Sequence, residues 1–312
     1  MIVEIASKLL SESLLSLYPI FVKNIGLPLS LQTWSRFFSY AFISGFFIDG
    51  PFVIKAMMTS TGMLLSLITM VHIYSSYRGF ELLESGVAYS IFYLYPIMIV
   101  LMAYNTDLYK NKQISYQKII PIMFLALFGV FLLVSNKHFD IMDIFNSPEG
   151  VVMLLLAAFT EASIYFLVKN IKTTNNWNHI FISYVWGAIF MSLYFIPNFS
   201  GSEATFKVSS WRLSAPLPNI AKITGAGTLI TSPLSVSLGI NIAIGLCGYL
   251  LRFFAISRLD PLLYASLSYF GIVMAFVYGI FLNGDIIDIK KIAGAVLIII
   301  SNLILMRDYV GV

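Results

Sequence analysis

The stretch Leu259–Met306 reads LDPLLYASLSYFGIVMAFVYGIFLNGDIIDIKKIAGAVLIIISNLILM. It predicts two apolar helices joined by a short polar connection, Asn283-Gly284-Asp285. Each helix has about the 20 residues that are needed to cross the hydrocarbon layer of a membrane. This stretch therefore predicts a helical protein built for a lipid bilayer.

The composition of the whole chain agrees with this prediction. Of the 312 residues, 59% are hydrophobic and only 11% are charged, whereas a soluble domain carries about 25% charged residues. The mean hydropathy is +0.87. The net charge of +4 is small and scattered along the chain, so nothing in the sequence indicates nucleic-acid binding. The partners that we expect are the lipid bilayer and a small-molecule solute.

The sequence predicts neither an enzyme nor a metal site. Its single cysteine, Cys247, excludes an intrachain disulfide and a cysteine-based metal cluster. The three histidines are far apart and show no ligand spacing. The chain also lacks a nucleophile elbow and a phosphate-binding glycine loop that precedes a lysine. We therefore expect no cofactor.

Windows of about 20 residues predict ten membrane-spanning helices, so the expected fold is an all-α polytopic membrane protein. The predicted spans are 5–23, 29–48, 57–77, 86–106, 117–135, 150–169, 179–197, 234–256, 262–282 and 289–306. Short connections join most of them, and the one long loop covers residues 198–233.

The distribution of lysine and arginine predicts the orientation of these spans. With the N-terminus inside, ten of these residues, including Lys8, fall on the inner side and five on the outer side, apart from three in the long loop. The positive-inside rule discounts long loops. We therefore expect both termini to be cytoplasmic.

Two features indicate an internal repeat. Phe21–Ile25 (FVKNI) ends the first span, and Leu167–Ile171 (LVKNI) ends the sixth. Because five spans separate these segments, the halves 1–136 and 137–312 would have opposite orientations. Such inverted repeats are common in secondary transporters, and chance similarity between apolar segments is the alternative.

The second feature is a triplet at i, i+4 and i+7, a spacing that places side chains on one helical face. It consists of Tyr89, Tyr93 and Pro96 in the fourth span and of Tyr264, Ser268 and Gly271 in the ninth. In the ninth span, Gly271, Ala275 and Gly279 also form a stripe of small residues. Such a stripe lets another helix approach closely in lipid.

Ten spans in a five-plus-five inverted repeat, with Lys23 and Lys169 at corresponding span ends and Arg36 in the second span, resemble the drug/metabolite transporter superfamily, EamA-like type. The segments Leu282–Asp285 (LNGD) and Lys291–Ala295 (KIAGA) are similar to the family's loop-and-glycine signature between its last two helices.

Single residues extend this resemblance. Pro96 matches the family's proline of the fourth span, and Gly129 matches its glycine of the fifth. The chain departs from the family with Asp285 in place of the usual Glu and with Gly271 where Pro is frequent. The resemblance implies transport, but the superfamily carries amino acids, nucleotide sugars, phosphorylated sugars, purines and drugs, so the substrate stays open.

Two carboxyl groups within predicted spans, Glu12 and Glu161, are candidate binding residues. A charge at the centre of a spanning helix costs about 2.5–3.5 kcal/mol on insertion scales, so it normally faces a cavity or a partner. Either residue could bind a cationic group or a coupling proton. The alternative is a buried carboxyl that is protonated or paired. We expect Glu161 to lie between the two halves, close to the first or ninth span.

Two arginines within spans, Arg36 and Arg252, could each hold a carboxylate or a phosphate through two parallel hydrogen bonds. As alternatives, Arg252 could extend to the lipid headgroups, and Arg36 could pair with Glu81 or Glu84. The repeated lysines, Lys23 and Lys169, predict a gating role, although lysine at a helix end is often an interface anchor.

For His72 we favour a hydrogen bond across helices over a proton relay, which its titration near neutral pH would permit. The tyrosines Tyr89, Tyr93, Tyr165 and Tyr264 could line a cavity and stack on a ring or donate a hydrogen bond. For those near span ends, an interfacial aromatic belt is the alternative.

These observations together predict a secondary transporter for a small polar or amphipathic organic metabolite. Transport would come from rocking of the two halves around a cavity at the membrane midplane. The alternative is a membrane scaffold or receptor that retains the fold, whose interior would be closed by apolar side chains. The sequence leaves open whether the chain is a homo-oligomer and whether a proton is coupled to transport.

Overall fold

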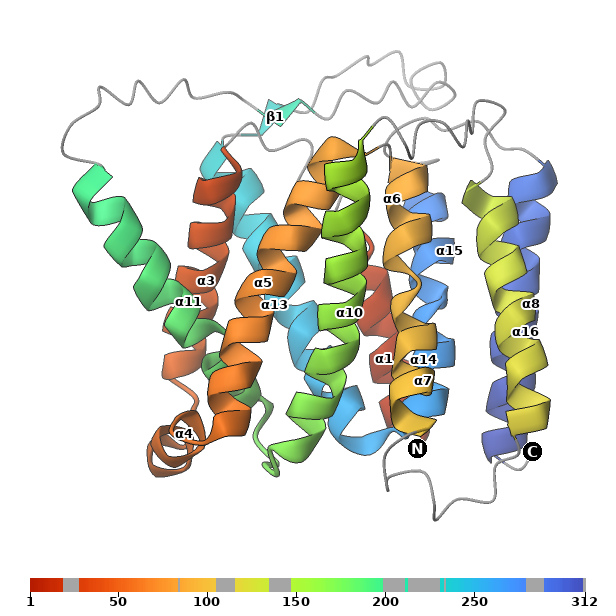
Figure 1. The fold of residues 1–312 in the computed structure, drawn as a ribbon, viewed down its shortest axis with the longest axis horizontal. Helices are drawn as coiled ribbons and strands as arrows, with labels where there is room; N and C mark the ends of the chain where they lie inside the picture. Colours follow the sequence, from red (N-terminus) through yellow and green to blue (C-terminus); the bar gives the residue numbers. More distant parts are fainter. Residues whose placement is uncertain are drawn as a thin grey trace.

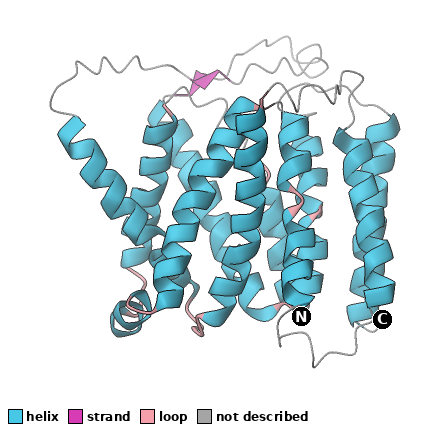
Figure 2. Ribbon diagram, in the orientation of Figure 1, coloured by secondary structure: helices cyan, strands magenta, loops and turns pink. Residues whose placement is uncertain are grey.

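The computed structural model describes residues 1–18, 28–83, 85–104, 116–134, 147–198, 211–212, 231–232, 234–278 and 289–310. Nearly all of these residues are helical (Figure 2). The helices of the first half are α1 (Ile2–Leu15), α3 (Leu29–Gly45), α4 (Gly50–Met57), α5 (Ser60–Leu82), α6 (Ser85–Phe92), α7 (Tyr95–Tyr104) and α8 (Tyr116–Val134). Those of the second half are α10 (Pro148–Asn170), α11 (Asn176–Asn198), α13 (Leu234–Arg258), α14 (Pro261–Ser268), α15 (Phe270–Tyr278) and α16 (Ile289–Val310).

The long helices run side by side through the molecule and alternate in direction (Figure 1). Two short strands, β1 (Trp211–Arg212) and β2 (Thr231–Ser232), pair antiparallel beyond one end of the helices. Helix α1 begins and α16 ends at the opposite end (Figure 1). We call these two ends of the bundle the β end and the terminal end.

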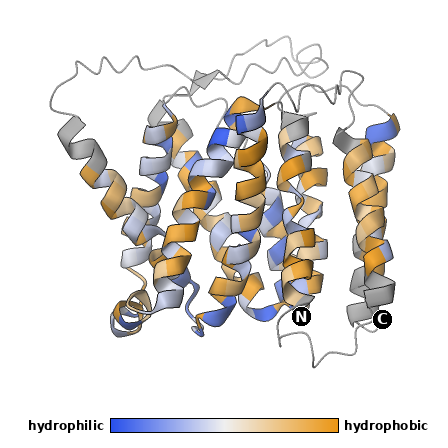
Figure 3. Ribbon diagram, viewed as in Figure 1, coloured by the Kyte–Doolittle hydropathy of each residue, from blue (hydrophilic) through white to orange (hydrophobic). Residues whose placement is uncertain are grey.

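Several helices are compatible with a membrane. The segments Pro148–Asn170, Leu238–Arg258 and Pro261–Tyr278 are long and apolar enough to cross one, and α4 and α5 pass the same test as a pair bent by 82°. Figure 3 shows that apolar residues predominate along the middle of the helices, while hydrophilic residues gather near their ends. Large apolar side chains also face outward, as expected where helices meet lipid; examples are Phe124, Phe159 and Phe190, which are 66%, 50% and 54% exposed.

Two of the predicted spans are each broken into two helices. The fourth span consists of α6 and α7, and the ninth consists of α14 and α15. Pro96 accounts for the first break because proline has no N–H for an intrahelical bond and favours the first turn of a helix. At the second break, the backbone N–H groups of Tyr269 and Ile272 each bond to a carbonyl three residues earlier, over 3.3 and 3.1 Å.

These breaks bear on one expectation from the sequence. Each i, i+4, i+7 triplet extends across the point where its span is interrupted, although Tyr264 and Ser268 both lie within α14. The spacing rule assumes an unbroken helix of 3.6 residues per turn, and a turn between two short helices changes that periodicity.

Helices of the first half pack mainly against helices of the second half. The principal pairs are α1 with α13, α5 with α10, α3 with α11, α7 with α14, and α8 with α16. Gly129 shows how close one of these contacts is, since a Cβ atom there would lie 2.7 Å from the carbonyl oxygen of Gly294. Only glycine allows the backbones of α8 and α16 to approach this closely.

Candidate functional site

A cavity, which we call the central cavity, lies inside the helical bundle and is lined mostly by the first half of the chain. Its walls come from α1, α3, α5, α6, α7 and α13. The volume is about 70 Å³, which is room for several water molecules. The lining includes six residues that the sequence predicted as site residues: Glu12, Arg36, His72, Tyr89, Tyr93 and Arg252.

The central cavity extends toward the β end of the bundle. Helix α5 ends and α6 begins at that end (Figure 1). Phe80 and Tyr89, which lie close to these helix termini, line the cavity. The Tyr89 hydroxyl donates a hydrogen bond of 2.8 Å to the carbonyl of Ser16, and this bond connects α6 to the segment that follows α1.

Glu12 is held by three partners. It forms a buried ion pair with Lys8, one turn earlier in α1. The hydroxyls of Tyr95 and Tyr93 donate to its two carboxylate oxygens over 3.3 and 3.5 Å. The Lys8 ammonium also lies 3.6 Å from the ring centroid of Tyr264, a favourable contact between a cation and an aromatic face.

The position of Lys8 corrects the count of inner positive charges, because this residue is fully buried and does not lie at a membrane surface. The sequence contained a signal that we did not use. Lys8 and Glu12 are at i and i+4, a spacing that brings opposite charges together on a helix.

Glu161 is 1% exposed and lies in a second buried ion pair. Arg252 on α13 contacts one carboxylate oxygen, and the Nε2 atom of His72 on α5 lies 3.2 Å from the other. These partners are on the third and eighth predicted spans, rather than on the first or ninth as we expected. Glu161 itself is absent from the described lining of the central cavity, although both partners line it. It therefore matches the alternative of a paired buried carboxyl.

His72 bridges helices α5 and α10. Its Nδ1 atom lies 3.1 Å from the carbonyl of Ala157 and 3.3 Å from the hydroxyl of Thr160. This geometry confirms the predicted hydrogen bond across helices. Arg252 is only 4% exposed and donates from Nε to the Tyr264 hydroxyl over 3.0 Å, so it does not extend to the headgroups.

Arg36 is enclosed by aromatic rings. Five tyrosine ring centroids lie between 4.5 and 5.7 Å from its guanidinium carbon. We call this group the tyrosine cage; it consists of Tyr18, Tyr40, Tyr77, Tyr184 and Tyr249. A desolvated cation–π contact contributes about 2 kcal/mol, and such contacts offset part of the cost of burying the charge.

The expected partners of Arg36 are not found in the described structure. Glu81 pairs with Arg78 over 3.0 Å, and Glu84 lies outside the described residues. The hydrogen bonds of Arg36 go instead to tyrosine hydroxyls, over 3.0 Å to Tyr184 and 3.4 Å to Tyr77.

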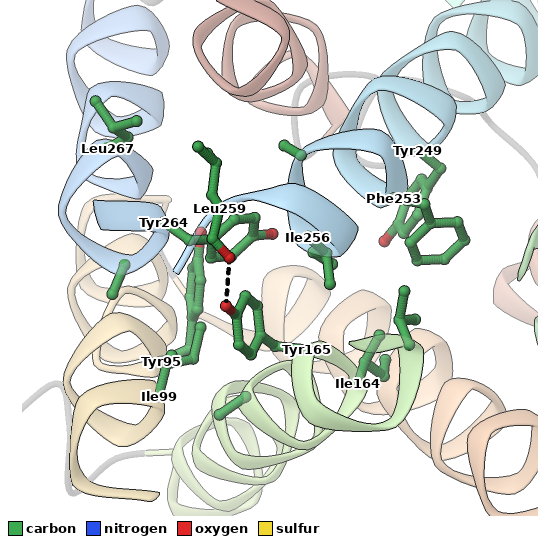
Figure 4. Close-up of a cluster of buried hydrophobic side chains, with 14 of the residues drawn as sticks. Tyr95, Ile99, Ile164, Tyr165, Tyr249, Phe253, Ile256, Leu259, Tyr264 and Leu267 are labelled. Carbon is green, nitrogen blue, oxygen red and sulfur yellow. Dashed lines mark hydrogen bonds between the residues drawn. The ribbon is translucent and has the colours of Figure 1, made fainter. Parts of the chain in front are cut away.

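A group of hydrogen bonds links α10 to the turn after α13 at the terminal end of the bundle. The hydroxyl of Tyr165 donates to the Leu259 carbonyl over 3.0 Å (Figure 4). The ammonium of Lys169 donates to the same carbonyl over 2.5 Å and to the Tyr165 hydroxyl over 3.1 Å. These contacts tie the last turns of α10 to the turn between α13 and α14.

The remaining predicted site residues support helix geometry and packing. Ser268 donates to the carbonyl of Tyr264 within α14, over 2.9 Å. Gly271 faces the Glu12 group, since a Cβ atom there would meet the Tyr93 hydroxyl and lie 2.6 Å from Oε2 of Glu12. Lys23 lies outside the described residues.

Comparisons with known proteins agree on the fold only. No protein-family model matches the sequence, and no curated protein matches it. Among solved structures, a chain described as "Crystal structure of protein" is similar, with a TM-score of 0.65 over 96% of this chain and 94% of that chain, at 12% sequence identity. At this identity the similarity shows a shared helical fold.

Proposed function

We propose that this chain is a secondary transporter of a small polar or amphipathic organic metabolite, of the EamA-like type in the drug/metabolite transporter superfamily. The observation that carries the proposal is the central cavity. It is lined by charged and aromatic side chains, most of them from the first half and two, Tyr249 and Arg252, from α13 of the second half. Transporters bind their substrates near the membrane midplane, where the two halves meet.

The helix contacts support a five-plus-five inverted repeat of ten spans. If α1, α3, α5, α6–α7 and α8 correspond to α10, α11, α13, α14–α15 and α16, the contact of α1 with α13 becomes equivalent to that of α10 with α5. The pairs α3–α11 and α8–α16 each join corresponding helices, and the α7–α14 contact joins the corresponding broken spans. A pseudo-twofold axis between inverted halves would generate this pattern.

The two broken spans support the same reading. They are the fourth span of each half, and discontinuous helices at corresponding positions of the two halves indicate a binding site in this class of protein. The side chains at the break between α6 and α7 line the central cavity, namely Phe92, Tyr93 and Tyr95.

Alternating access would use the two ends of the bundle in turn. The central cavity extends toward the β end, and a separate depression opens at the terminal end, with Asp49, Lys172 and Ser257 in its lining. Lys169 lines this depression and bonds, like Tyr165, to the Leu259 carbonyl. In the proposed cycle, these contacts would open when the terminal end gives access to the solute.

The test is solute flux into liposomes that contain the purified protein, screened over metabolite classes with and without a pH gradient. A cavity variant, Ser76→Trp, should abolish the flux because Ser76 lines the central cavity. A matched control, Ser163→Trp, changes a half-buried serine of α10 that bonds only to its own helix and should retain the flux. If no solute class is transported, the scaffold or receptor becomes the better reading.

A further inference from the structure

We propose that Arg36 binds the carboxylate of an organic monoanion in the central cavity, which, if the chain is a transporter as proposed above, makes its solute an amphipathic monocarboxylate. The inference begins from the charges inside the bundle. Apart from histidine, five charged side chains are buried among the described residues: Lys8, Glu12, Arg36, Glu161 and Arg252.

Four of these five charges neutralise one another. Lys8 pairs with Glu12, and Arg252 pairs with Glu161. Arg36 is the remaining charge, and no described carboxylate forms an ion pair with it. A buried charge without a counterion is unfavourable in a low-dielectric interior. One negative charge beside Arg36 would make the interior neutral.

The guanidinium of Arg36 also has an N–H donor that makes no hydrogen bond among the described residues. Arginine carries five N–H donors and no acceptor. Two tyrosine hydroxyls receive hydrogen bonds from its Nη atoms, while Nε is buried without a hydrogen-bond partner among the described residues. The side chain is 4% exposed and lines the central cavity, so a ligand inside the cavity would lie next to it. A carboxylate matches a guanidinium with two parallel hydrogen bonds.

The tyrosine cage separates into two parts around this site. Tyr18, Tyr77 and Tyr249 line the central cavity together with Arg36. Tyr40 and Tyr184 are fully buried and do not belong to the described lining of the cavity. The rings stabilise the cation without neutralising it, so the positive charge stays available to an anion in the cavity.

The rest of the cavity suits an apolar or aromatic body. Phe80 and Tyr89 line it toward the β end and Phe92 lines it at the break between α6 and α7, and these rings can pack edge-to-face or offset against a ligand ring. The ligand would place its carboxylate at Arg36 and its apolar part toward the β end.

The pairing of the two acids disfavours a cationic ligand. An ammonium group would have to displace Lys8 from Glu12 or Arg252 from Glu161, whereas a carboxylate finds an unneutralised cation. A phosphate monoester carries close to two negative charges at neutral pH and would leave one negative charge in excess. A monocarboxylate fits the charge balance best.

The experiment is a calorimetric titration of the full-length protein in detergent. The probe is 3-phenylpropionate, and its matched analogues are the neutral 3-phenylpropanol, the cationic 3-phenylpropylammonium and the dianionic 2-phenylethyl phosphate. We expect the carboxylate to bind at least tenfold more tightly than each analogue. Equal or tighter binding of any analogue would overturn the proposal.

Variants locate the site. Arg36→Gln should weaken 3-phenylpropionate binding at least tenfold, and Arg36→Lys should weaken it less, because lysine keeps the charge but loses the planar fork. Arg78→Gln is the matched control, since Arg78 lies on α5 in surface ion pairs with Glu81 and Glu149; its binding should not change. Unchanged affinity in a folded Arg36→Gln protein overturns the proposal. If Arg36→Gln does not fold, the Arg36→Lys variant decides: it must bind 3-phenylpropionate more weakly than the wild type does, or the proposal fails.

The same titration separates this inference from the proposed function. Carboxylate binding through Arg36 without flux in liposomes would support the anion site and reject the transporter. Flux of other solutes by a protein that does not bind 3-phenylpropionate would support transport and reject the anion site.

Discussion

Lys169 and Leu259, which are 90 residues apart in the sequence, meet at the terminal end of the bundle, where the Lys169 ammonium donates to the Leu259 carbonyl over 2.5 Å. The carbonyl belongs to the turn between α13 and α14, and Lys169 belongs to the last turn of α10. The hydroxyl of Tyr165 donates to the same oxygen. Two side chains of α10 therefore bond to the same backbone carbonyl in the turn between α13 and α14.

We predict that Lys169→Met loosens the terminal end, because the variant removes the charge-assisted bond to that carbonyl. A reporter cysteine at Ala255, which is fully buried near the end of α13, should then react with a thiol reagent severalfold faster. The reporter variants are made in a protein that carries Cys247→Ser, because the native Cys247 is exposed and would also react with the reagent.

Lys172→Met is the matched control for this experiment. Lys172 is exposed in the same terminal depression but makes no described bond to Leu259, so its loss changes the local charge alone. Equal acceleration in both variants would mean that charge, rather than the bond to Leu259, controls access.

The sequence predicted the order and approximate bounds of the helices because long apolar runs dominate it. The predicted segments 150–169 and 234–256, for example, became α10 (Pro148–Asn170) and α13 (Leu234–Arg258). The sequence did not predict the bend between α4 and α5. Gly50–Met57 is one short helix that meets the next at 82°, and hydropathy windows carry no information about direction.

The candidate site was predictable only in part. Charge within predicted spans identified Glu12, Arg36 and Glu161, because the cost of burying a charge is a property of each residue alone. Their partners depend on which helices pack together. The tyrosine cage illustrates this limit, since its rings come from positions 18 to 249 with no spacing that links them.

The topology of the proposed transporter gives a second prediction. Single cysteines at Thr174, in the turn between α10 and α11, and at Thr231 in β2 should react with impermeant reagents from opposite faces of the membrane. These positions lie at the terminal end and the β end of the bundle (Figure 1). Labelling of both from the same face would contradict the ten-span arrangement, and Thr174 should be the cytoplasmic one if the termini are inside.

Close packing at the second helix break gives a third prediction. Gly271→Ala should lower the unfolding temperature in detergent by several degrees, because the added methyl group would lie 2.6 Å from Oε2 of Glu12 and would also meet the Tyr93 hydroxyl. Gly239→Ala on α13 is the matched control, since nothing lies within 4 Å of a Cβ atom there. Alanine is also the better helix former by about 1 kcal/mol, so this control should be neutral or slightly stabilising.

The same comparison refines the predicted stripe of small residues. Ala275 is half-buried, so Ala275→Leu should be tolerated better than Gly271→Leu. Gly279 lies outside the described residues. Similar unfolding temperatures for all these variants and the wild type would show that Gly271 does not require its small size.

The last prediction concerns Glu161 and Arg252, whose ion pair joins α10 to α13 inside the bundle. If Glu161 bound a cationic substrate or a coupling proton, as the sequence allows, Glu161→Gln would fold normally and lose transport or its pH dependence. The pairing changes that expectation, because the variant leaves the guanidinium of Arg252 buried without its carboxylate. Removal of one partner of a buried pair typically costs about 3–5 kcal/mol, since the other charge stays uncompensated. Glu161→Gln should therefore unfold at a clearly lower temperature and give less folded protein.

A double variant separates this cost from the loss of transport. Glu161→Gln with Arg252→Gln removes both charges and should recover much of the unfolding temperature, because replacing both members of a buried pair is often tolerated. Glu149→Gln is the matched control, since it removes a carboxylate from an exposed pair with Arg78 near the start of α10 and should cost at most about 1 kcal/mol. If Glu161→Gln unfolds at the wild-type temperature and transports normally, Arg252 does not depend on Glu161 as its counterion.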